Sequence, residues 1–113
     1  SGGNVQKLIV GREFDYDPDL LIMNQPTRGI DVGAIEFIRK KIVDMRARKK
    51  AILLVSADLS EILSLSDTIL VMHEGRIVGH ISDVKNTSEN DLGLYMLGVK
   101  EDSKEQIGGA YCE

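Results

Sequence analysis

Two short apolar runs, separated by an amphipathic segment, constrain the fold of this chain most strongly. The runs are Leu20–Met23 and Ala51–Val55, and neither alternates apolar with polar residues. Unalternating runs of this length are typical of strands buried on both faces, as in parallel sheets. Between them, over residues 33–49, apolar residues recur at helical spacing with lysines and arginines opposite. The order strand, helix, strand predicts an α/β fold with a parallel sheet.

Three further helices are expected from the spacing of their apolar residues. The first covers residues 3–15 and is entered through glycines, and the second is short and contains Leu59. Ser88 lies three residues before Asp91 and precedes more apolar residues, which weakly resembles a capping box. This pattern predicts the last helix.

The C-terminal half of the chain predicts an antiparallel hairpin followed by a tail. Residues 68–72 and 76–81 are β-rich runs, and residues 73–75 between them suit a hairpin turn. Residues 99–113 carry mixed charge and two adjacent glycines, and we expect them to be a mobile tail. The expected domain therefore covers residues 1–98.

The length of the chain and of its apolar runs limits its class. With 113 residues it can build one small core. No apolar run approaches the roughly 20 residues that span a bilayer. The one cysteine, Cys112, cannot form an internal disulfide, which fits a reducing compartment. The chain begins at Ser1 in a helical pattern, and we interpret it as a piece of a longer protein.

The net charge and the spacing of the histidines argue against a nucleic-acid site and a zinc site. The net charge of −4 makes nucleic acid an unexpected partner. The basic residues at 40–41 and 46–50 are expected on the solvated face of an amphipathic helix. His73 and His80 have no neighbouring His or Cys at zinc-ligand spacing, so surface roles and no metal site are expected.

Four segments resemble, in order, the motifs of ABC ATPases. Ser1–Lys7 looks like the signature motif without its first leucine. Residues 20–31 resemble the second nucleotide-binding strand, called Walker B, and the D-loop that follows it. Residues 56–62 align with the switch segment, and residues 66–78 match the hairpin after it. Shared order and spacing over most of the chain make coincidence a poor explanation.

The form of these motifs is similar to that of nucleoside and simple-sugar importers. Asn4 in the signature motif is typical of them, and Gln25–Ile38 is especially similar to the second of their two tandem ATPase domains. The resemblance implies a partial P-loop NTPase core, with a mainly parallel sheet, flanking helices and a C-terminal antiparallel hairpin. It also implies a parent at the cytoplasmic face of the cell membrane, partnered by an opposing ABC ATPase domain and membrane permease subunits.

The first residues suit contact with a phosphate. A Gly-Gly turn lets backbone N–H groups approach an anion, and the positive end of the following helix favours the negative charge. An ordinary glycine-rich helix start has the same pattern. In the family, however, this motif reaches across a dimer to ATP held by the opposing domain. The resemblance thus implies these nucleotide-binding residues: Ser1, Gly2, Gly3, Asn4 and Gln6, with Asp31 in the D-loop.

Three positions depart from the catalytic pattern of the family. The Walker B strand normally ends in an aspartate and then a glutamate, where this chain has Asn24 and Gln25. Both keep hydrogen-bonding ability but lack the charge that complements magnesium or accepts a proton. Ala57 replaces the usual switch histidine and offers no donor to the γ-phosphate. We interpret the three as a degenerate hydrolysis half-site with no intact catalytic residue. Singly, each also fits an ordinary polar turn or small packed residue.

The chain lacks a phosphate loop of the form G-x-x-x-x-G-K-[ST]. We therefore expect ATP and magnesium to act in the full-length parent, and the chain alone neither to hydrolyse ATP nor to bind it tightly. Two alternatives to an importer subunit stay open. One is a soluble ABC-type ATPase in translation or DNA maintenance, which shares all four motifs. The other is a silent regulatory or scaffolding module.

Overall fold

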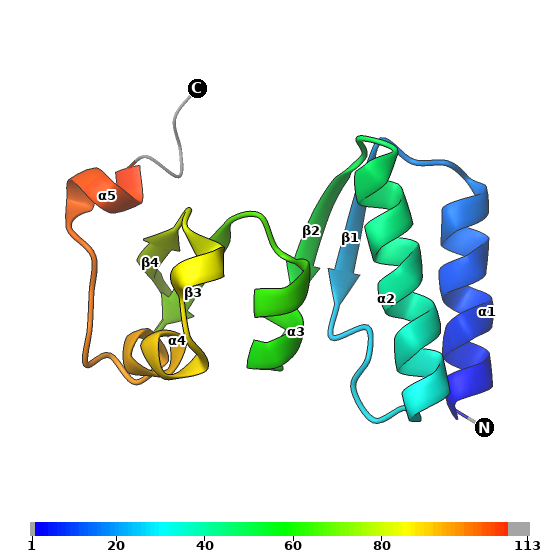
Figure 1. The fold of residues 1–113 in the computed structure, drawn as a ribbon, viewed down its shortest axis with the longest axis horizontal. Helices are drawn as coiled ribbons and strands as arrows, with labels where there is room; N and C mark the ends of the chain where they lie inside the picture. The colour runs from blue at the N-terminus through cyan, green and yellow to red at the C-terminus, as the bar shows by residue number, and fades with distance from the viewer. Residues whose placement is uncertain (1, 109–113) are drawn as a thin grey trace. The chain divides into compact units, whose positions relative to one another are not determined.

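The structure is a computed structural model that describes residues 2–108 (Figure 1). The chain forms two compact units, which divide between Ala57 and Asp58. Ser1, one of the proposed nucleotide-binding residues, and residues 109–113, which include Cys112, lie outside the described part.

The N-terminal unit contains two helices and a two-stranded parallel sheet (Figure 1). In chain order its elements are α1 (Gly2–Asp15), β1 (Leu20–Asn24), α2 (Val32–Ala47) and β2 (Ala51–Val55). The strands pair from Leu20 opposite Ala51 to Asn24 opposite Val55. The predicted strand, helix, strand order with parallel pairing is therefore confirmed.

The ends of these elements follow from local chemistry. Asp31 caps α2, and its side chain accepts a hydrogen bond from the Ala34 N–H at 2.8 Å. After the helix, Lys49 adopts a left-handed backbone with φ of 62°. Asp17 likewise has φ of 49° after α1, and its N–H donates to the Phe14 carbonyl at 3.0 Å. Asp is one of the residue types that tolerates this conformation.

The core of the unit lies on one face of the sheet. Leu21 and Met23 are its buried residues from β1. The helices contribute the remaining buried apolar side chains, which are Val10, Phe14, Ala34, Ile38, Ile42 and Met45. Burying one large aliphatic side chain of this kind stabilises a fold by about 1.5–3 kcal/mol.

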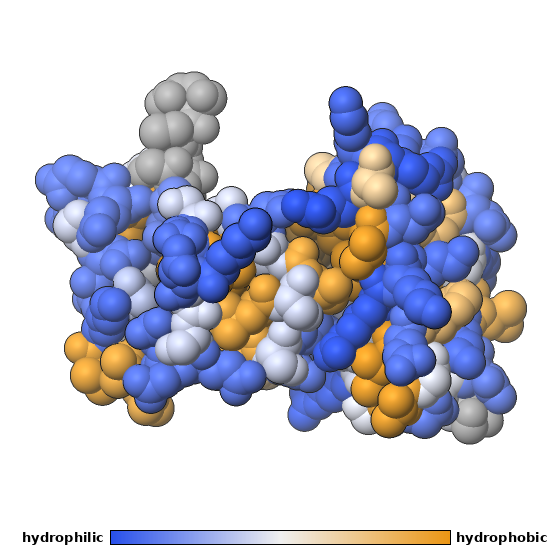
Figure 2. Space-filling model, viewed as in Figure 1, coloured by the Kyte–Doolittle hydropathy of each residue, from blue (hydrophilic) through white to orange (hydrophobic). Residues whose placement is uncertain are grey.

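The opposite face of the sheet differs from the sequence-based expectation. Both strands were predicted to be buried on both faces, but Leu20 and Ile22 are 56% and 64% exposed and Leu53 and Val55 are 52% and 45% exposed. Within the N-terminal unit this face is uncovered, since α1 and α2 both pack on the other face of the sheet. Apolar surface is visible among the polar regions of the molecule in Figure 2.

The second unit is built around the predicted antiparallel hairpin. Strands β3 (Ile69–His73) and β4 (Arg76–Ile81) pair in antiparallel register. Glu74 and Gly75 between them both have positive φ, 49° and 76°. Two such residues are what a type I′ hairpin turn requires. The other elements are α3 (Leu59–Leu65), the 3-10 turn η1 (Val84–Asn86), α4 (Glu89–Met96) and α5 (Lys104–Gly108).

The core of the second unit joins the hairpin to the helices. Its buried cluster consists of Ile69, Val71, Val78, Ile81, Val84, Leu92 and Tyr95, with Leu59, Ile62 and Leu63 packed against it. Gly79 is necessary for this packing, because a Cβ there would lie 2.9 Å from Cδ1 of Tyr95. The aromatic ring therefore rests directly on the backbone of β4.

Helix α4 begins with the predicted capping box. The Ser88 hydroxyl oxygen accepts from the Asp91 N–H at 3.1 Å, and the Asp91 carboxylate accepts from the Ser88 N–H at 2.9 Å. Hydrogen bonding of the Asp91 carboxylate to the backbone and side chain of Ser88 favours its ionised form and lowers the pKa of Asp91.

Residues 99–108, here called the terminal segment, form hydrogen bonds with β4 and α4. They include α5, and the Asp102 N–H donates to the Val78 carbonyl on β4 at 2.8 Å. The Asp102 carboxylate accepts from the His80 N–H at 2.9 Å and from the Tyr95 hydroxyl at 2.6 Å. The terminal segment therefore forms hydrogen bonds with main-chain groups on the outer edge of β4, the edge that does not pair with β3. The domain boundary at residue 98 and the mobile tail over residues 99–113 stay predictions.

Among residues 2–108, no helix combines the length and the apolar character that a membrane span needs.

Candidate functional site

The two glycines at the start of α1 occupy different surroundings. Gly2 is exposed, and a Cβ built there would meet no heavy atom within 4 Å. Gly3 is buried, and a Cβ there would lie 2.6 Å from Oδ2 of Asp31 and 3.2 Å from Cβ of Ala34. A side chain at Gly2 would thus meet open space, whereas Gly3 allows α1 to pack closely on the start of α2.

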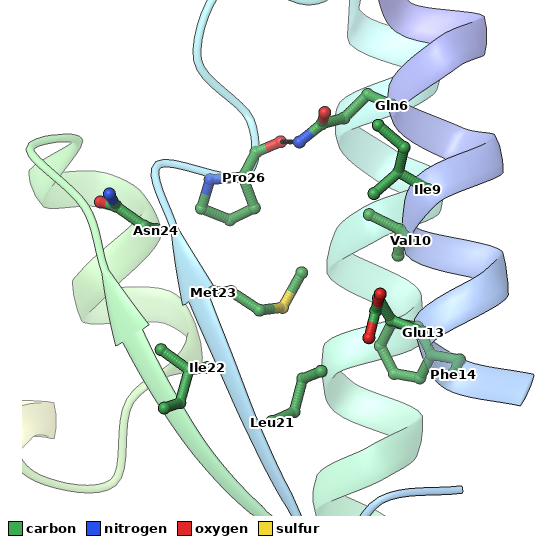
Figure 3. A pocket seen from close by; sticks show the side chains of 10 residues that line it. All are labelled: Gln6, Ile9, Val10, Glu13, Phe14, Leu21, Ile22, Met23, Asn24 and Pro26. Carbon is green, nitrogen blue, oxygen red and sulfur yellow. Dashed lines mark hydrogen bonds between the residues drawn. The ribbon is translucent and has the colours of Figure 1, made fainter. Parts of the chain in front are cut away.

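Gln6 points from α1 to the D-loop (Figure 3). Its side-chain Nε2 donates a hydrogen bond to the Pro26 carbonyl at 2.8 Å, and the bond is partly buried. The sequence interpretation placed Gln6 among the nucleotide-binding residues and gave no sign of this contact. Asn4, two residues earlier, is exposed.

The D-loop, residues 26–31, ends at a carboxylate that serves two elements. Oδ1 of Asp31 caps α2, and its Oδ2 lies against Gly3 of α1. Within the loop, Gly29 has φ of 72°, a conformation that favours glycine. The structure therefore brings Asp31 and Gly3, which belong to two of the proposed motifs, into contact.

The degenerate positions meet where β1 and β2 end. Asn24 is the last residue of β1 and is exposed. Gln25 follows with a left-handed φ of 50°, and its N–H donates to the Val55 carbonyl at 2.7 Å. Its side-chain Oε1 accepts from the Ala57 N–H at 3.1 Å. The sequence did not predict this bond, which directly joins the proposed Walker B and switch positions.

These positions have limited chemistry. Asn24, Gln25 and Ala57 carry no charge, and an amide oxygen is a poor proton acceptor. Magnesium sites in nucleotide-binding proteins use one or two carboxylates, so these three residues do not fit such a site. Among residues 2–108, no cluster of three or more His, Cys, Asp or Glu side chains is arranged to hold a metal ion.

A cavity of about 170 Å³ lies between α1 and β1 (Figure 3). Its lining is mainly apolar, including Ile9 and Met23, and its polar side chains are Gln6, Glu13 and Asn24. Phosphate groups need convergent N–H donors or cations, so this cavity is not a phosphate site.

The two histidines contact main-chain carbonyls in the second unit. Nδ1 of His73 lies 2.8 Å from the Met96 carbonyl oxygen, and Nδ1 of His80 lies 2.9 Å from that of Gln106. The His73 ring also packs on Gly98, where a Cβ would lie 2.6 Å from its Nε2. The histidines thus secure the end of α4 and the terminal segment.

Comparison with known proteins identifies import ATP-binding proteins among the relatives of this chain, although no protein-family model matches it. It is 51% identical over 109 residues to the guanosine import ATP-binding protein of Bacillus subtilis. It is 52% identical over 98 residues to the nucleoside import ATP-binding protein of Lactococcus lactis, and 43% identical over 107 residues to the ribose import ATP-binding protein of Yersinia pestis. These matches cover 96%, 87% and 95% of the chain but only 21%, 19% and 21% of the relatives.

Two solved structures share the fold. One is the ADP conformation of an ATP-binding cassette of an ABC transporter, with a TM-score of 0.64 and 19% identity. The other is a nucleotide-free ATP-binding cassette, with a TM-score of 0.66 and 21% identity. Each match covers all of this chain and 41% of the solved chain. The chain is therefore homologous to about one fifth of the length of nucleoside and sugar import ATP-binding proteins, and its fold is that of part of an ABC ATPase domain.

Proposed function

We propose that the chain is the C-terminal part of the second ATPase domain of a nucleoside or simple-sugar importer. Identities of 43–52% to import ATP-binding proteins support the transport class. The parent would work at the cytoplasmic face of the membrane, with an opposing ABC ATPase domain and membrane permease subunits as partners. Hydrolysis of bound ATP would supply the energy for uptake.

The open start of α1 carries the proposed role of this chain. Gly2 presents an unobstructed backbone at the positive end of a 14-residue helix, which suits approach to the terminal phosphate of a nucleotide. The proposed partner of this turn is ATP held by the opposing domain. Because the chain has no phosphate loop, tight ATP binding by the chain alone is not part of the proposal.

The two ATP sites of the parent are proposed to be unequal. The site completed by Gly2 and Gly3 stays catalytic when the opposing domain keeps its carboxylates and histidine. The site that contains Asn24 and Gln25 has no proton-accepting carboxylate at those positions, so it holds nucleotide with little turnover.

A pair of substitutions in the full-length parent, within its permease complex, tests this division. Gly2→Glu places bulk and negative charge beside the γ-phosphate and is expected to lower the ATPase rate at least tenfold. Gln25→Ala removes no carboxylate and is expected to leave the rate within about twofold. Gly11→Glu is the matched control, because Gly11 is also on α1 with no atom within 4 Å of a Cβ. Loss of turnover in Gln25→Ala but not in Gly2→Glu would contradict the proposal.

A silent regulatory or scaffolding role is the second candidate. The uncharged set of Asn24, Gln25 and Ala57 favours it, because the half-site of this chain lacks the usual acid and base. ATP turnover by the full-length parent in its complex decides between the two. Complete absence of turnover supports the silent module, and measurable turnover supports the importer ATPase.

A further inference from the structure

The D-loop contacts α1 at its first and last residues. At its start, the Pro26 carbonyl accepts from Nε2 of Gln6 at 2.8 Å. At its end, Asp31 packs on Gly3 so closely that a Cβ would lie 2.6 Å from Oδ2. Asp31 cannot move aside freely, because its other carboxylate oxygen caps α2. Helix and loop therefore form a joint with two separate contacts.

The direction of the Gln6 side chain indicates its role. Gln6 lies one helical turn beyond Gly2, and its amide is directed to Pro26 (Figure 3). The bond is partly buried and joins residues 20 positions apart, so it fixes the loop to the helix. An amide nitrogen engaged in this way is not presented to a ligand at the open helix start.

From these contacts we infer that Gln6 is a positioning residue, which holds the D-loop against the signature helix. The inference rests on the proposed function, since it assigns a role within the same composite site. Gln6 at one end of the loop and Gly3 at the other hold it against α1.

The joint matters because small displacements are costly in phosphoryl transfer. A shift of about 1 Å in a catalytic group can lower a rate by about two orders of magnitude. Without its bond to Gln6, the D-loop loses one of the contacts with α1 described above, and Gly2 and Gly3 are held less firmly. Gly2 and Gly3 are then oriented less precisely in the transition state. Ground-state binding of ATP is retained, because in the proposal the opposing phosphate loop provides it.

Gln6→Met tests this inference in the full-length parent with its permease, because it keeps the side-chain length but removes the donor. We expect kcat to fall three- to tenfold while the KM for ATP stays within twofold. Amide hydrogen exchange in the peptide covering residues 26–31 is expected to rise at least threefold. Leu8→Met, a matched change on the same helix at a side chain that is 75% exposed, is expected to alter neither quantity.

Two further variants keep the test decisive. Gln6→Arg retains N–H donors and is expected to keep more than half of kcat. If Gln6→Met does not assemble, Gln6→Asn replaces it, because its amide is one methylene too short to reach Pro26. A raised KM with unchanged kcat would make Gln6 a nucleotide ligand and overturn the inference. Unchanged kcat and unchanged exchange would overturn it as well.

The Gly2→Glu variant, measured in parallel, separates the two possible failures. If Gly2→Glu lowers turnover and Gln6→Met does not, the positioning role alone is wrong. If Gly2→Glu leaves turnover unchanged, the proposed use of the signature motif is wrong, and the inference fails with it.

Discussion

At the scale of single residues, two adjacent glycines of one motif have different physical reasons to be glycine. Gly2 leaves backbone exposed, and Gly3 avoids a collision with Asp31. The sequence shows only the pair of glycines. The distinction depends on Asp31, which lies 28 positions further along the chain, and so it required the three-dimensional structure.

We predict that Gly3→Ala lowers the stability of the chain relative to Gly2→Ala. Within a helix, alanine is favoured over glycine by about 1 kcal/mol. At Gly3 this gain is offset, because displacing Asp31 loses a cap of α2 that contributes about 1 kcal/mol, and the overlap adds strain. Thermal unfolding of both variants checks the difference.

The control for this prediction removes the Asp31 carboxylate, which a side chain at position 3 would meet. In an Asp31→Gly background, Gly3→Ala is expected to lose its cost, because no carboxylate remains to be displaced. If Gly3→Ala lowers the melting temperature equally in both backgrounds, Asp31 is not the cause.

Tyr95 gives a prediction at alkaline pH. Burial of its hydroxyl, its bond to Asp102 and the nearby negative charges raise its pKa from 10.0 to about 12. A raised pKa means that the folded state holds the proton more tightly than the unfolded state. The resulting stability is present below pH 10 and is lost as the pH rises from 10 towards 12.

The free energy of unfolding is therefore expected to fall more steeply between pH 10 and 12 in the unsubstituted chain than in Tyr95→Phe. The difference in tyrosinate absorbance between the two proteins reports the pKa of Tyr95 directly. A midpoint near 10 in that difference titration would show that Tyr95 is not perturbed.

At the scale of elements, α4 depends on its first turn. We predict that Ser88→Ala destabilises the chain by about 1 kcal/mol, because it removes the hydroxyl that accepts from Asp91 N–H. Ser82→Ala, at an exposed serine outside the helix, is the control and is expected to change stability little. Chemical denaturation of both variants measures the effect, and equal midpoints would count against the cap.

The stability contributed by the same cap is expected to change with pH in the acid range. The two hydrogen bonds from Ser88 lower the pKa of Asp91 below its usual 3.8. The stability contributed by this carboxylate is therefore present above the unfolded pKa and is lost as the pH falls through the folded value.

The elements themselves were largely predictable, because local patterns determine them. The parallel strands, the hairpin turn at Glu74 and Gly75, and the Ser88 capping box all follow from short stretches of sequence. The contacts of Gln6 with Pro26 and of Asp102 with β4 were not predictable. Each joins residues 20 or more positions apart. The sequence alone does not distinguish Gln6 and Asp102 from the other amide and carboxylate side chains that could form such bonds.

The candidate site, like the elements, was predicted from the sequence only in part. The positions of Asn24, Gln25 and Ala57 came from the resemblance, and the structure brings Gln25 and Ala57 into hydrogen-bonding contact. The burial of β1 and β2 on both faces was expected from their composition alone. Composition reports that a side chain is apolar but not which segment covers it, so the exposed face was missed.

At the scale of the whole molecule, the uncovered face of the β1–β2 sheet governs behaviour in solution. We predict that the isolated chain self-associates or is only marginally stable, because exposed apolar strands invite contact with another chain. Replacing Ile22 and Leu53, both more than half exposed, with lysine is expected to reduce association. Leu8→Lys, on the surface of α1, is the control. Sedimentation across concentrations and thermal melting test this, and a highly stable monomer would refute it.

The terminal segment has a consequence for proteolysis. A protease that cut between Gly98 and Asp102 would free the Val78 carbonyl and the His80 N–H, which are two neighbouring groups on the outer edge of β4. It would also take the acceptor from the Tyr95 hydroxyl. Release of the terminal segment after such a cut is therefore expected to leave an unpaired edge of β4, which is a template for strand addition.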